Sequence, residues 1–322
     1  MLDIEIRESE KMKKICLVGC GTIGKRHAGN LQGKAELVFC SRTLDSARAF
    51  NEAYNGSGVF SLDEALRRED VSGVVIASPP EFHKDQVVAA LASGKGVLVE
   101  KPMCVSPEEV EEIQKAVSEA QSGFLMVAEN YYYKPSLTKI KGWMAAGAIG
   151  RVQSVSVKKL STQVASGWKT GYGALLEGGI HFVALMNDLF KEDPVGVSAV
   201  FPGYASGPER HSVTTLTYAD DVTARLEYSW NTPSLLKGTF HHSSILGDRG
   251  RIVFESNGIY TILASGFRRR LRFPGFGDLM GYEEMTRDFL RCLDQSDAQP
   301  YSDVVRARRD LKVVFDAYTM LG

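Results

Sequence analysis

The chain of 322 residues lacks several features that would place it in other protein classes. No apolar run approaches the roughly 20 residues that span a bilayer, and the charged first dozen residues contain no signal-peptide core. The five cysteines form no C-x-x-C pair. Lysine plus arginine (38) balances aspartate plus glutamate (39), so the net charge of −1 favours neither nucleic acid nor an anionic membrane. We therefore expect a cytoplasmic protein without nucleic-acid or membrane partners.

A glycine-rich turn near the start of the chain is the clearest motif. A short apolar strand that starts at residue 14 leads into Gly19, Gly21 and Gly24, spaced as G-x-G-x-x-G, and then into a helix. In a dinucleotide site these glycines allow a tight turn, a close pyrophosphate and close helix packing, in that order. The free amides of the new helix point at the phosphates. The predicted phosphate loop is Gly19, Gly21, Thr22, Ile23 and Gly24; a ligand-free turn and a methyltransferase loop are the alternatives.

The first 130 residues alternate short apolar runs with helical stretches. After the strand at residue 14, the expected strands are 35–40, 59–60, 73–77, 97–99 and 124–128. Ser61 and Ser106 are expected N-caps of helices, because each has a glutamate three residues further on. This alternation is typical of an α/β fold with a doubly wound parallel sheet, whose ligand crevice lies at the carboxyl ends of the strands.

After residue 130 the pattern changes to long alternating strands with hairpin-length gaps. The expected strands are 151–160, 195–201, 212–218, 223–230, 238–246 and 251–255, and the expected helices are 134–146, 173–189, 279–294 and 302–321. This pattern predicts an α+β domain with a large, mostly antiparallel open sheet. The expected domains are an extension over 1–12, a Rossmann domain over 13–130 and an α+β domain over 131–322, whose last helix could pack back on the Rossmann domain.

The end of the second strand bears on which nucleotide binds. An NAD-specific domain usually has an acidic residue there for the ribose hydroxyls. Here Ser41 and Arg42 follow the strand, and no acid occurs until Asp45. Because a serine can donate to a 2′-phosphate and an arginine can neutralise it, we expect NADP(H) to be preferred. If Arg42 is only a solvated residue at the helix start, NAD(H) could bind as well.

Two clusters carry candidate chemistry. Lys101, in Glu100-Lys101-Pro102, follows the fifth strand and so faces the crevice, where its amine can exchange a proton with a substrate hydroxyl. Glu177 and His181 are four residues apart on one expected helix and share a face. His181 could carry proton transfer, and Glu177 could bind substrate hydroxyls or orient the imidazole. Two ligands are too few for a metal site, so no metal is expected.

The combined motifs resemble one known family. They are the glycine loop, Ser78-Pro79-Pro80 with His83, Glu100-Lys101-Pro102, Glu129-Asn130, and Gly178-x-x-His181. Together they resemble the glucose-fructose oxidoreductase, inositol dehydrogenase and rhizopine-catabolism family (Gfo/Idh/MocA). The resemblance implies hydride transfer between NAD(P) and a hydroxyl or keto carbon of a sugar, inositol or small polyol. It also implies Lys101 and His181 as acid and base, and a homodimer or homotetramer formed through the second sheet.

The same resemblance assigns further site residues. Besides the glycine loop, Ser41 and Arg42, it implies cofactor contacts from Ser78, Pro79, His83, Glu100, Lys101 and Asn130. It implies substrate contacts from Lys101, Trp168, Glu177 and His181, with Glu177 standing where members usually have aspartate.

Two other functions remain open, and several histidines and arginines are expected to have no catalytic role. The alternatives are a catalytically silent NADP-sensing regulator and a lyase or glycosidase that uses bound NAD transiently. His27 is expected to pack or meet solvent, and His241 and His242 to face opposite sides of one strand. Residues 268–270, all arginine, are expected at a solvated hairpin tip, with a phosphate-bearing substrate as the alternative.

Overall fold

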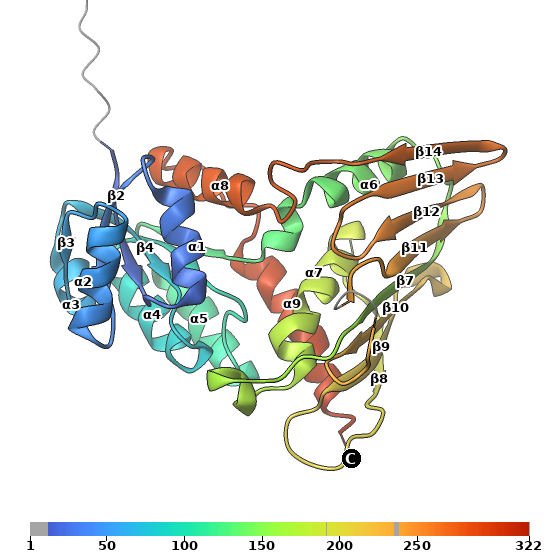
Figure 1. Ribbon diagram of the computed structural model, residues 1–322, viewed down its shortest axis with the longest axis horizontal. Helices are drawn as coiled ribbons and strands as arrows, with labels where there is room; N and C mark the ends of the chain where they lie inside the picture. The colour runs from blue at the N-terminus through green and yellow to red at the C-terminus, as the bar shows by residue number, and fades with distance from the viewer. Residues whose placement is uncertain (1–11, 191, 235–237, 322) are drawn as a thin grey trace, which may run out of the picture.

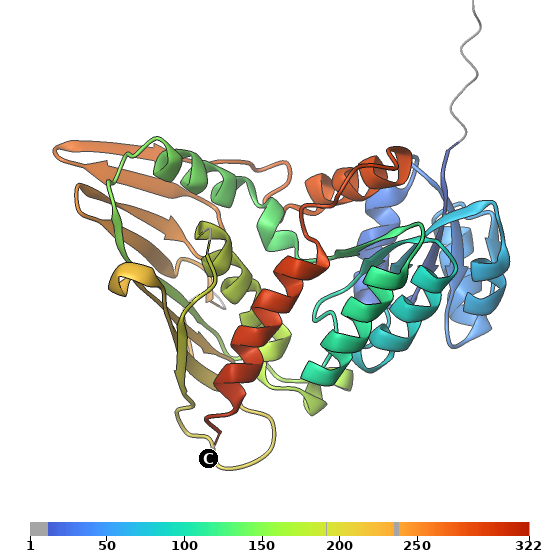
Figure 2. The same ribbon diagram turned by 180° about the vertical axis from the view of Figure 1, so that it is seen from behind.

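A computed structural model describes residues 12–190, 192–234 and 238–321, so most of the expected extension over 1–12 lies outside the described residues. The described chain forms two lobes, each organised around one β-sheet (Figure 1). A long helix near the end of the chain lies between the two lobes (Figure 2). The prediction of a Rossmann domain joined to an α+β domain with a large, mostly antiparallel sheet is confirmed.

The first lobe is a six-stranded parallel sheet in the order β3-β2-β1-β4-β5-β6. Its strands are β1 (Lys14–Val18), β2 (Glu36–Cys40), β3 (Gly58–Val59), β4 (Val71–Ile76), β5 (Gly96–Val99) and β6 (Phe124–Val127). Its helices are α1 (Thr22–Leu31), α2 (Leu44–Ala53), α3 (Leu62–Arg67), α4 (His83–Ala92) and α5 (Pro107–Glu119), with a 3-10 turn η1 (Pro80–Phe82) before α4. The predicted caps are confirmed, since Ser61 accepts from the Glu64 amide and Ser106 from the Glu109 amide.

Strand alternation explains why both faces of this sheet are covered. Ile15 and Leu17 of β1 belong to one apolar cluster with α1 and α2, whereas Cys16 and Val18 belong to a second cluster with α3, α4 and α5. Successive side chains of a strand point to opposite faces, so an uninterrupted apolar run needs a layer of helices on each side. The carboxyl ends of the strands remain open between these layers.

The second lobe is an eight-stranded sheet in the order β14-β13-β12-β11-β7-β10-β9-β8. Its strands are β7 (Val152–Leu160), β8 (Gly196–Val200), β9 (His211–Thr217), β10 (Thr223–Ser229), β11 (His242–Gly247), β12 (Gly250–Glu255), β13 (Thr261–Ser265) and β14 (Arg268–Arg272). All neighbouring strands are antiparallel except β7 and β10, which pair in parallel.

Three sequence-based details of this sheet were wrong. The strands β13 and β14 were not predicted, and the arginines at 268–270 lie along the exposed edge strand β14 rather than at a hairpin tip. The strand predicted from Gly238 begins only at His242, so the alternation argument for His241 and His242 does not apply; residues 235–237 lie outside the described part. An exposed edge strand made of four arginines and one leucine is hard to separate from a loop by sequence.

Helices cover the inner face of the second sheet. They are α6 (Pro135–Ala145), α7 (Ile180–Leu189) and α9 (Val304–Tyr318), whereas α8 (Tyr282–Asp294) lies over the first lobe next to α1 (Figure 1). The predicted helix over 173–189 opens with a π-helical turn, Leu175–Gly179, before α7 begins. Short 3-10 turns are η2 (Asn130–Tyr133), η3 (Gly167–Gly171) and η5 (Ala219–Asp221). Within the described residues, no helix combines the length and the apolarity that crossing a membrane would need.

Candidate active site

The glycine turn has the shape that a bound pyrophosphate requires. Gly19 has φ +102°, and a Cβ added to it would lie 2.5 Å from the Ala77 carbonyl. A Cβ on Gly24 would lie 2.1 Å from the Gly19 oxygen, so this glycine allows α1 to pack against the turn. A Cβ on Gly21 would meet nothing within 4 Å. The protein therefore leaves open space beside Gly21, next to the amides that begin α1 at Thr22, and these residues fit a dinucleotide.

The end of β2 leaves a cation accessible at the same edge of the sheet. Ser41 is half-buried and Arg42 is exposed, whereas Asp45 lies in the first turn of α2. Among the described residues, no hydrogen bond or ion pair involves the Arg42 guanidinium. An unpaired guanidinium beside a phosphate loop is well suited to bind a further phosphate.

The loop after β5 is fixed by a buried ion pair. Glu100 is 6% exposed and lies 2.6 Å from Nε2 of His27, which is itself buried on α1. Burial alone would raise the pKa of Glu100, but the hydrogen bond and charge of His27, together with the charge of Lys101, lower it below its ordinary value. His27 is thus a packed residue, and Glu100 holds the backbone amide of Lys101 at 3.1 Å. This arrangement orients the start of the reactive loop.

His83 joins this loop to the one after β4. Its Nδ1 lies 2.9 Å from the Pro102 oxygen and its Nε2 lies 2.8 Å from the Ser78 oxygen, and the ring is completely buried. Burial lowers the pKa of His83. The Lys101–Pro102 peptide is cis, and Pro79 follows Ser78 in the second loop. Each ring nitrogen therefore lies within hydrogen-bond distance of a backbone carbonyl, one in each loop, and His83 links the two loops at the carboxyl edge of the sheet.

A π-helical turn presents Glu177 to Lys101. The Lys101 ammonium donates to the Glu177 backbone carbonyl, and its Nζ lies 3.6 Å from a Glu177 carboxylate oxygen. A π turn shifts backbone bonding from i+4 to i+5 and is frequent at functional sites. The adjacent Gly178 is required here, because a Cβ on it would lie 2.1 Å from the Tyr228 hydroxyl. The turn thus brings an ammonium from the first lobe onto the second.

A second lysine, missed in the sequence, also binds Glu177. The Nζ of Lys169, on η3, lies 2.5 Å from the Glu177 carboxylate. Burial alone would raise the pKa of Glu177, but the charges of Lys101 and Lys169 outweigh burial and lower it. Trp168, the neighbouring residue, is half-buried, and its ring centroid lies 6.0 Å from that of Tyr172. No spacing rule links residue 169 to residue 177, so only the fold brings them together.

His181 is oriented by Glu129, not by Glu177. Its Nδ1 lies 2.7 Å from the Glu129 carboxylate, which also accepts from the backbone amide of Tyr131 at 3.1 Å. The sequence-based suggestion that Glu177 orients the imidazole was therefore wrong. Since a carboxylate accepts only, Nδ1 carries the proton and Nε2 of the neutral ring is left with its lone pair. Glu129 belongs to the Glu129-Asn130 motif that was noted in the sequence. No local sequence pattern, however, predicts that it pairs with residue 181.

The three consecutive tyrosines have different partners. Tyr131 stacks on His181 with ring centroids 4.7 Å apart and an angle of 14°. The hydroxyl of Tyr132 donates to Asp310, and that of Tyr133 donates to Asp288. The adjacent Asn130 is buried and donates to the Met280 carbonyl at 2.6 Å. Only Tyr131 of these residues contacts a candidate catalytic group within the described chain.

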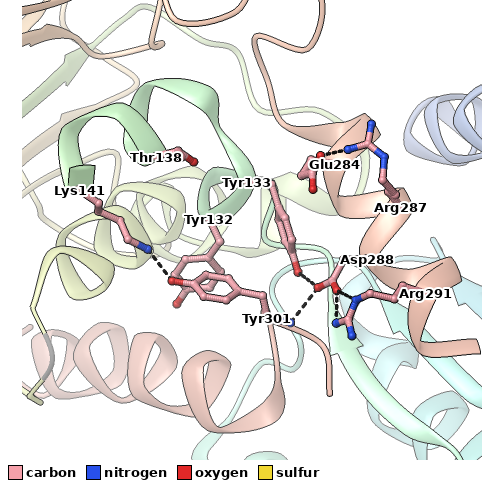
Figure 3. A pocket seen from close by; sticks show the side chains of 9 residues that line it. All are labelled: Tyr132, Tyr133, Thr138, Lys141, Glu284, Arg287, Asp288, Arg291 and Tyr301. Atoms are coloured by element: carbon pink, nitrogen blue, oxygen red, sulfur yellow. Dashed lines mark hydrogen bonds and ion pairs between the residues drawn. The ribbon is translucent and has the colours of Figure 1, made fainter. Parts of the chain in front are cut away.

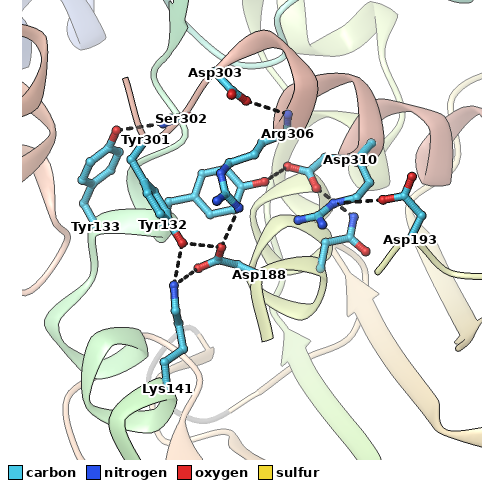
Figure 4. A network of polar contacts seen from close by, with 12 residues as sticks. Tyr132, Tyr133, Lys141, Asp188, Asp193, Tyr301, Ser302, Asp303, Arg306 and Asp310 are labelled. Carbon is cyan, nitrogen blue, oxygen red and sulfur yellow. Dashed lines mark hydrogen bonds and ion pairs between the residues drawn. The ribbon is translucent and has the colours of Figure 1, made fainter. Parts of the chain in front are cut away.

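A buried polar network anchors the helix that carries His181. Asp188 of α7 lies 2.7 Å from Lys141 and 3.0 Å from Arg306 (Figure 4). The neighbouring Asn187 donates to Asp310 of α9 at 2.8 Å. Burial raises the pKa of Asp310 to about 7. These contacts join α6, α7 and α9 across long sequence separations, and they fix α7 from its carboxyl end.

Glu209 fixes the other end of the same helix. Its buried carboxylate accepts from the backbone amides of Ala174 at 2.7 Å and Leu175 at 2.8 Å, and from the Tyr318 hydroxyl at 2.7 Å. Burial raises the pKa of Glu209. A carboxylate on free amides at a helix start satisfies donors that the helix cannot. Glu209 therefore caps the π turn that presents Glu177.

A hollow of about 350 Å³ lies apart from these groups, between η2, α6 and α8 (Figure 3). It is lined by Tyr132, Tyr133, Thr138, Lys141, Glu284, Arg287, Asp288, Arg291 and Tyr301. Its charged side chains have ion-pair partners, such as Asp288 for Arg291 at 2.5 Å and Asp188, outside the lining, for Lys141 at 2.7 Å. It contains neither Lys101 nor His181.

Comparison with known families decides the classification. A model described as an oxidoreductase family with an NAD-binding Rossmann fold, Gfo/Idh/MocA, matches residues 13–128. A model of the Gfo/Idh/MocA C-terminal domain matches residues 137–253. The chain belongs to the Gfo/Idh/MocA family. The family resemblance found in the motifs is confirmed, and the two matched regions correspond to the two lobes.

Relatives in the Gfo/Idh/MocA family are named dehydrogenases. Glucose-6-phosphate 3-dehydrogenase of Bacillus subtilis is 30% identical over 195 residues, which are 56% of this chain and 55% of the relative. Inositol 2-dehydrogenase of Rhizobium meliloti is 29% identical over 187 residues, which are 57% of this chain and 56% of the relative. The chain thus spans little more than half the length of each.

Solved structures of the family share the fold over nearly the whole chain. A 3-ketoreductase from Actinomadura kijaniata, in complex with NADP and TDP-benzene, has a TM-score of 0.81 at 21% identity and covers 96% of this chain and 98% of its own. A dehydrogenase from Bordetella pertussis, in complex with NADH and UDP-GlcNAcA, has a TM-score of 0.82 at 22% identity, with 97% and 96% covered. At this level of identity the likeness establishes the fold.

Proposed function

We propose that this protein is an NAD(P)-dependent oxidoreductase that prefers NADP(H) and acts on a hydroxyl or keto carbon of a sugar, inositol or similar small polyol. The observation that carries the proposal is the contact between Lys101 and the Glu177 carbonyl. It brings an ammonium at the carboxyl edge of the Rossmann sheet to the turn that precedes His181. The names of the relatives, which are sugar and inositol dehydrogenases, support the same chemistry.

In this proposal, side chains from both lobes act on one hydroxyl group of the substrate. Nε2 of His181 accepts the proton of the substrate hydroxyl, because Nδ1 is committed to Glu129. Lys101 donates a hydrogen bond to the same oxygen, and Glu177 holds the Lys101 and Lys169 ammonium groups in place and accepts from a neighbouring hydroxyl. A bound nicotinamide supplies or accepts the hydride. Trp168 forms part of the substrate wall next to Lys169.

Some of the predicted cofactor residues contact the cofactor, and others fix the backbone around it. Gly19, Gly21, Thr22, Ile23 and Gly24 hold the pyrophosphate, and Ser41 and Arg42 hold a 2′-phosphate. The loops that carry Ser78, Pro79, Glu100 and Lys101 border the nicotinamide. His83 and Asn130 are fully buried and bonded to backbone carbonyls. His83 contributes by fixing those loops, whereas Asn130 fixes the segment after β6 to Met280, just before α8.

We also infer the units, the assembly and the compartment. Residues 13–130 form the cofactor-binding unit, and 131–322 form the substrate-binding and assembly unit. The face of the second sheet away from the helices carries exposed apolar side chains such as Val200 and Leu246, which supports a homodimer or homotetramer through this face. The five cysteines are all free thiols, which supports a reducing compartment such as the cytoplasm.

The test is an absorbance assay at the reduced-nicotinamide band with a panel of sugars, inositols and keto-sugars. We expect turnover with NADPH or NADP⁺, and a lower preference for NADP(H) over NAD(H), by about tenfold, in Arg42→Ala. Binding without turnover for every polyol would instead favour a nucleotide-sensing regulator. Tightly held cofactor with product formed and no net change in reduced nicotinamide would favour a lyase or glycosidase.

A further inference from the structure

Lys134 is a fully buried lysine that the chemistry described so far does not use. It is 1% exposed, and its Nζ has no hydrogen-bond partner among the described residues. Room for its stem depends on Gly258, because a Cβ there would lie 3.1 Å from the Lys134 Cε. A buried ammonium without a hydrogen bond is unfavourable for folding. The presence of a lysine at this buried position is better explained by an electrostatic role than by packing.

The ammonium of Lys134 faces the aromatic ring that His181 stacks on. Its Nζ lies 3.9 Å from the centroid of Tyr131, and the centroid of the His181 ring lies 4.7 Å from the same point. Tyr131 is buried and cannot move away without leaving the core. One aromatic ring therefore contacts both a cation and the imidazole that we assign to proton transfer.

The charged groups around His181 differ from those around Lys134. The Glu129 carboxylate lies 2.7 Å from Nδ1 of His181 and places a negative charge beside the ring. Glu177, on the π turn before α7, lies 3.6 Å from the Lys101 ammonium. Around Lys134 the charged groups are Glu255 at the end of β12, Lys159 of β7 and Glu129. Burial, the largest effect, lowers the pKa of Lys134 to about 7, although Glu255 opposes this shift. Lys134 therefore supplies positive charge on the side of Tyr131 up to about pH 7.

We propose that Lys134 is a positioning residue that holds Tyr131 against His181 and offsets Glu129, so that Nε2 of His181 stays free to accept a proton. The proposal rests on the proposed function for the role of His181. Without the cation, Glu129 alone acts on the imidazole, which then retains its proton to higher pH, so that less of the ring is free to accept a proton at neutral pH. Lys134, Tyr131, His181 and Glu129 form one stacked arrangement. Glu129 comes from the first lobe, and the other three residues come from the second.

The test compares Lys134→Met with Lys139→Met. Lys139 is exposed on the same helix and lies 5.5 Å from the ring centroid of Trp143, so the control removes a cation over an aromatic ring that does not contact a histidine. The titration of the His181 ring is followed by NMR of the intact, substrate-free protein, with the signal assigned by its loss in His181→Gln. We expect the midpoint in Lys134→Met to rise by about half to one pH unit, from the loss of one nearby charge.

Activity gives a second measurement of the same change. The acid limb of the kcat profile should move to higher pH by the same amount in Lys134→Met, while the affinity for the cofactor stays as in the wild type. An unchanged midpoint in folded Lys134→Met, or an equal rise in Lys139→Met, would overturn the proposal. If Lys134→Met does not fold, Lys134→Gln provides the same test with an uncharged side chain of similar length. Because the NMR titration needs no substrate, absence of turnover would count against the proposed function and leave this test intact.

Discussion

The two lobes position their functional groups by different means. In the first lobe, Gly21, Arg42 and Lys101 lie on short turns that directly follow strands of a parallel sheet. In the second lobe, Glu177 and His181 lie on a helix that is held by Glu209 at one end and by the network around Asp188 at the other (Figure 4). The first arrangement is local in sequence, whereas the second depends on residues that are tens to more than a hundred positions apart.

This difference affects how each lobe should respond to mutation. A turn at the carboxyl end of a strand is fixed by the sheet, so a change there removes one contact to a ligand and leaves the fold intact. A helix fixed by buried polar contacts loses stability and geometry together when one contact is removed. The comparison therefore predicts separate effects on binding and stability in the first lobe, and coupled effects in the second.

The largest effect is expected for Lys101→Met, at the contact between the lobes. Removal of the ammonium takes away the donor to the substrate oxygen, and we expect kcat to fall by about 10²–10⁴-fold. The affinity for the cofactor should change little, because the glycine turn that holds the pyrophosphate follows a different strand, β1. Stopped-flow turnover together with fluorescence titration of NADPH measures both quantities. Equal turnover in the variant would remove Lys101 from the reaction.

The next effect concerns Gly21 and uses Gly29 as a matched control. A Cβ at either position meets no atom of the protein within 4 Å, but only Gly21 borders the phosphate loop. We expect Gly21→Ala to weaken cofactor binding by about 10–100-fold while the melting temperature is kept, because the methyl occupies the space of the pyrophosphate. Gly29→Ala, inside α1, should raise the stability slightly and leave binding unchanged. Calorimetric titration with NADPH distinguishes the two variants.

Glu209→Gln tests the coupled behaviour of the second lobe. One carboxylate oxygen becomes an NH₂ group that faces a backbone amide or the Tyr318 hydroxyl, so a buried donor loses its acceptor. We expect the free energy of unfolding to fall by about 1–3 kcal/mol, with a reduction in kcat. Tyr318→Phe, which removes one donor and leaves the amides bonded, should cost less. Urea unfolding and the polyol assay measure the two effects; a loss of activity with no loss of stability would contradict the coupling.

The smallest effect is a pH dependence that belongs to the second lobe. Burial raises the pKa of Asp310 from 3.8 to about 7, so its contribution to folding is complete below pH 3.8 and is lost as the pH rises through 7. Asp310→Asn does not titrate. We therefore expect the unfolding free energy of the wild type, relative to this variant, to fall by about 1–2 kcal/mol between pH 6 and pH 8. Urea titrations at both pH values test this, and a constant difference would show that Asp310 stays ionised.

The same contrast explains what the sequence could predict. The parallel sheet, the glycine loop and the place of Lys101 follow from local patterns, because a parallel sheet sets the position of each turn. The pairing of His181 with Glu129, the contact of Lys169 with Glu177 and the caps from Glu209 could not be predicted, since each joins segments that only the tertiary fold brings together. The exposed edge strand β14 was missed because its run of arginines lacks the alternation of a half-buried strand.

The central claim is that Lys101 and His181 act on the same substrate hydroxyl, and a double-mutant cycle tests it most directly. The measurement is kcat for one polyol in the wild type, Lys101→Met, His181→Gln and the double variant. If the two side chains act as one unit, the double variant should be about as slow as the slower single variant. If the two losses multiply, the groups act independently, and the shared role assigned to the ammonium and the imidazole is contradicted.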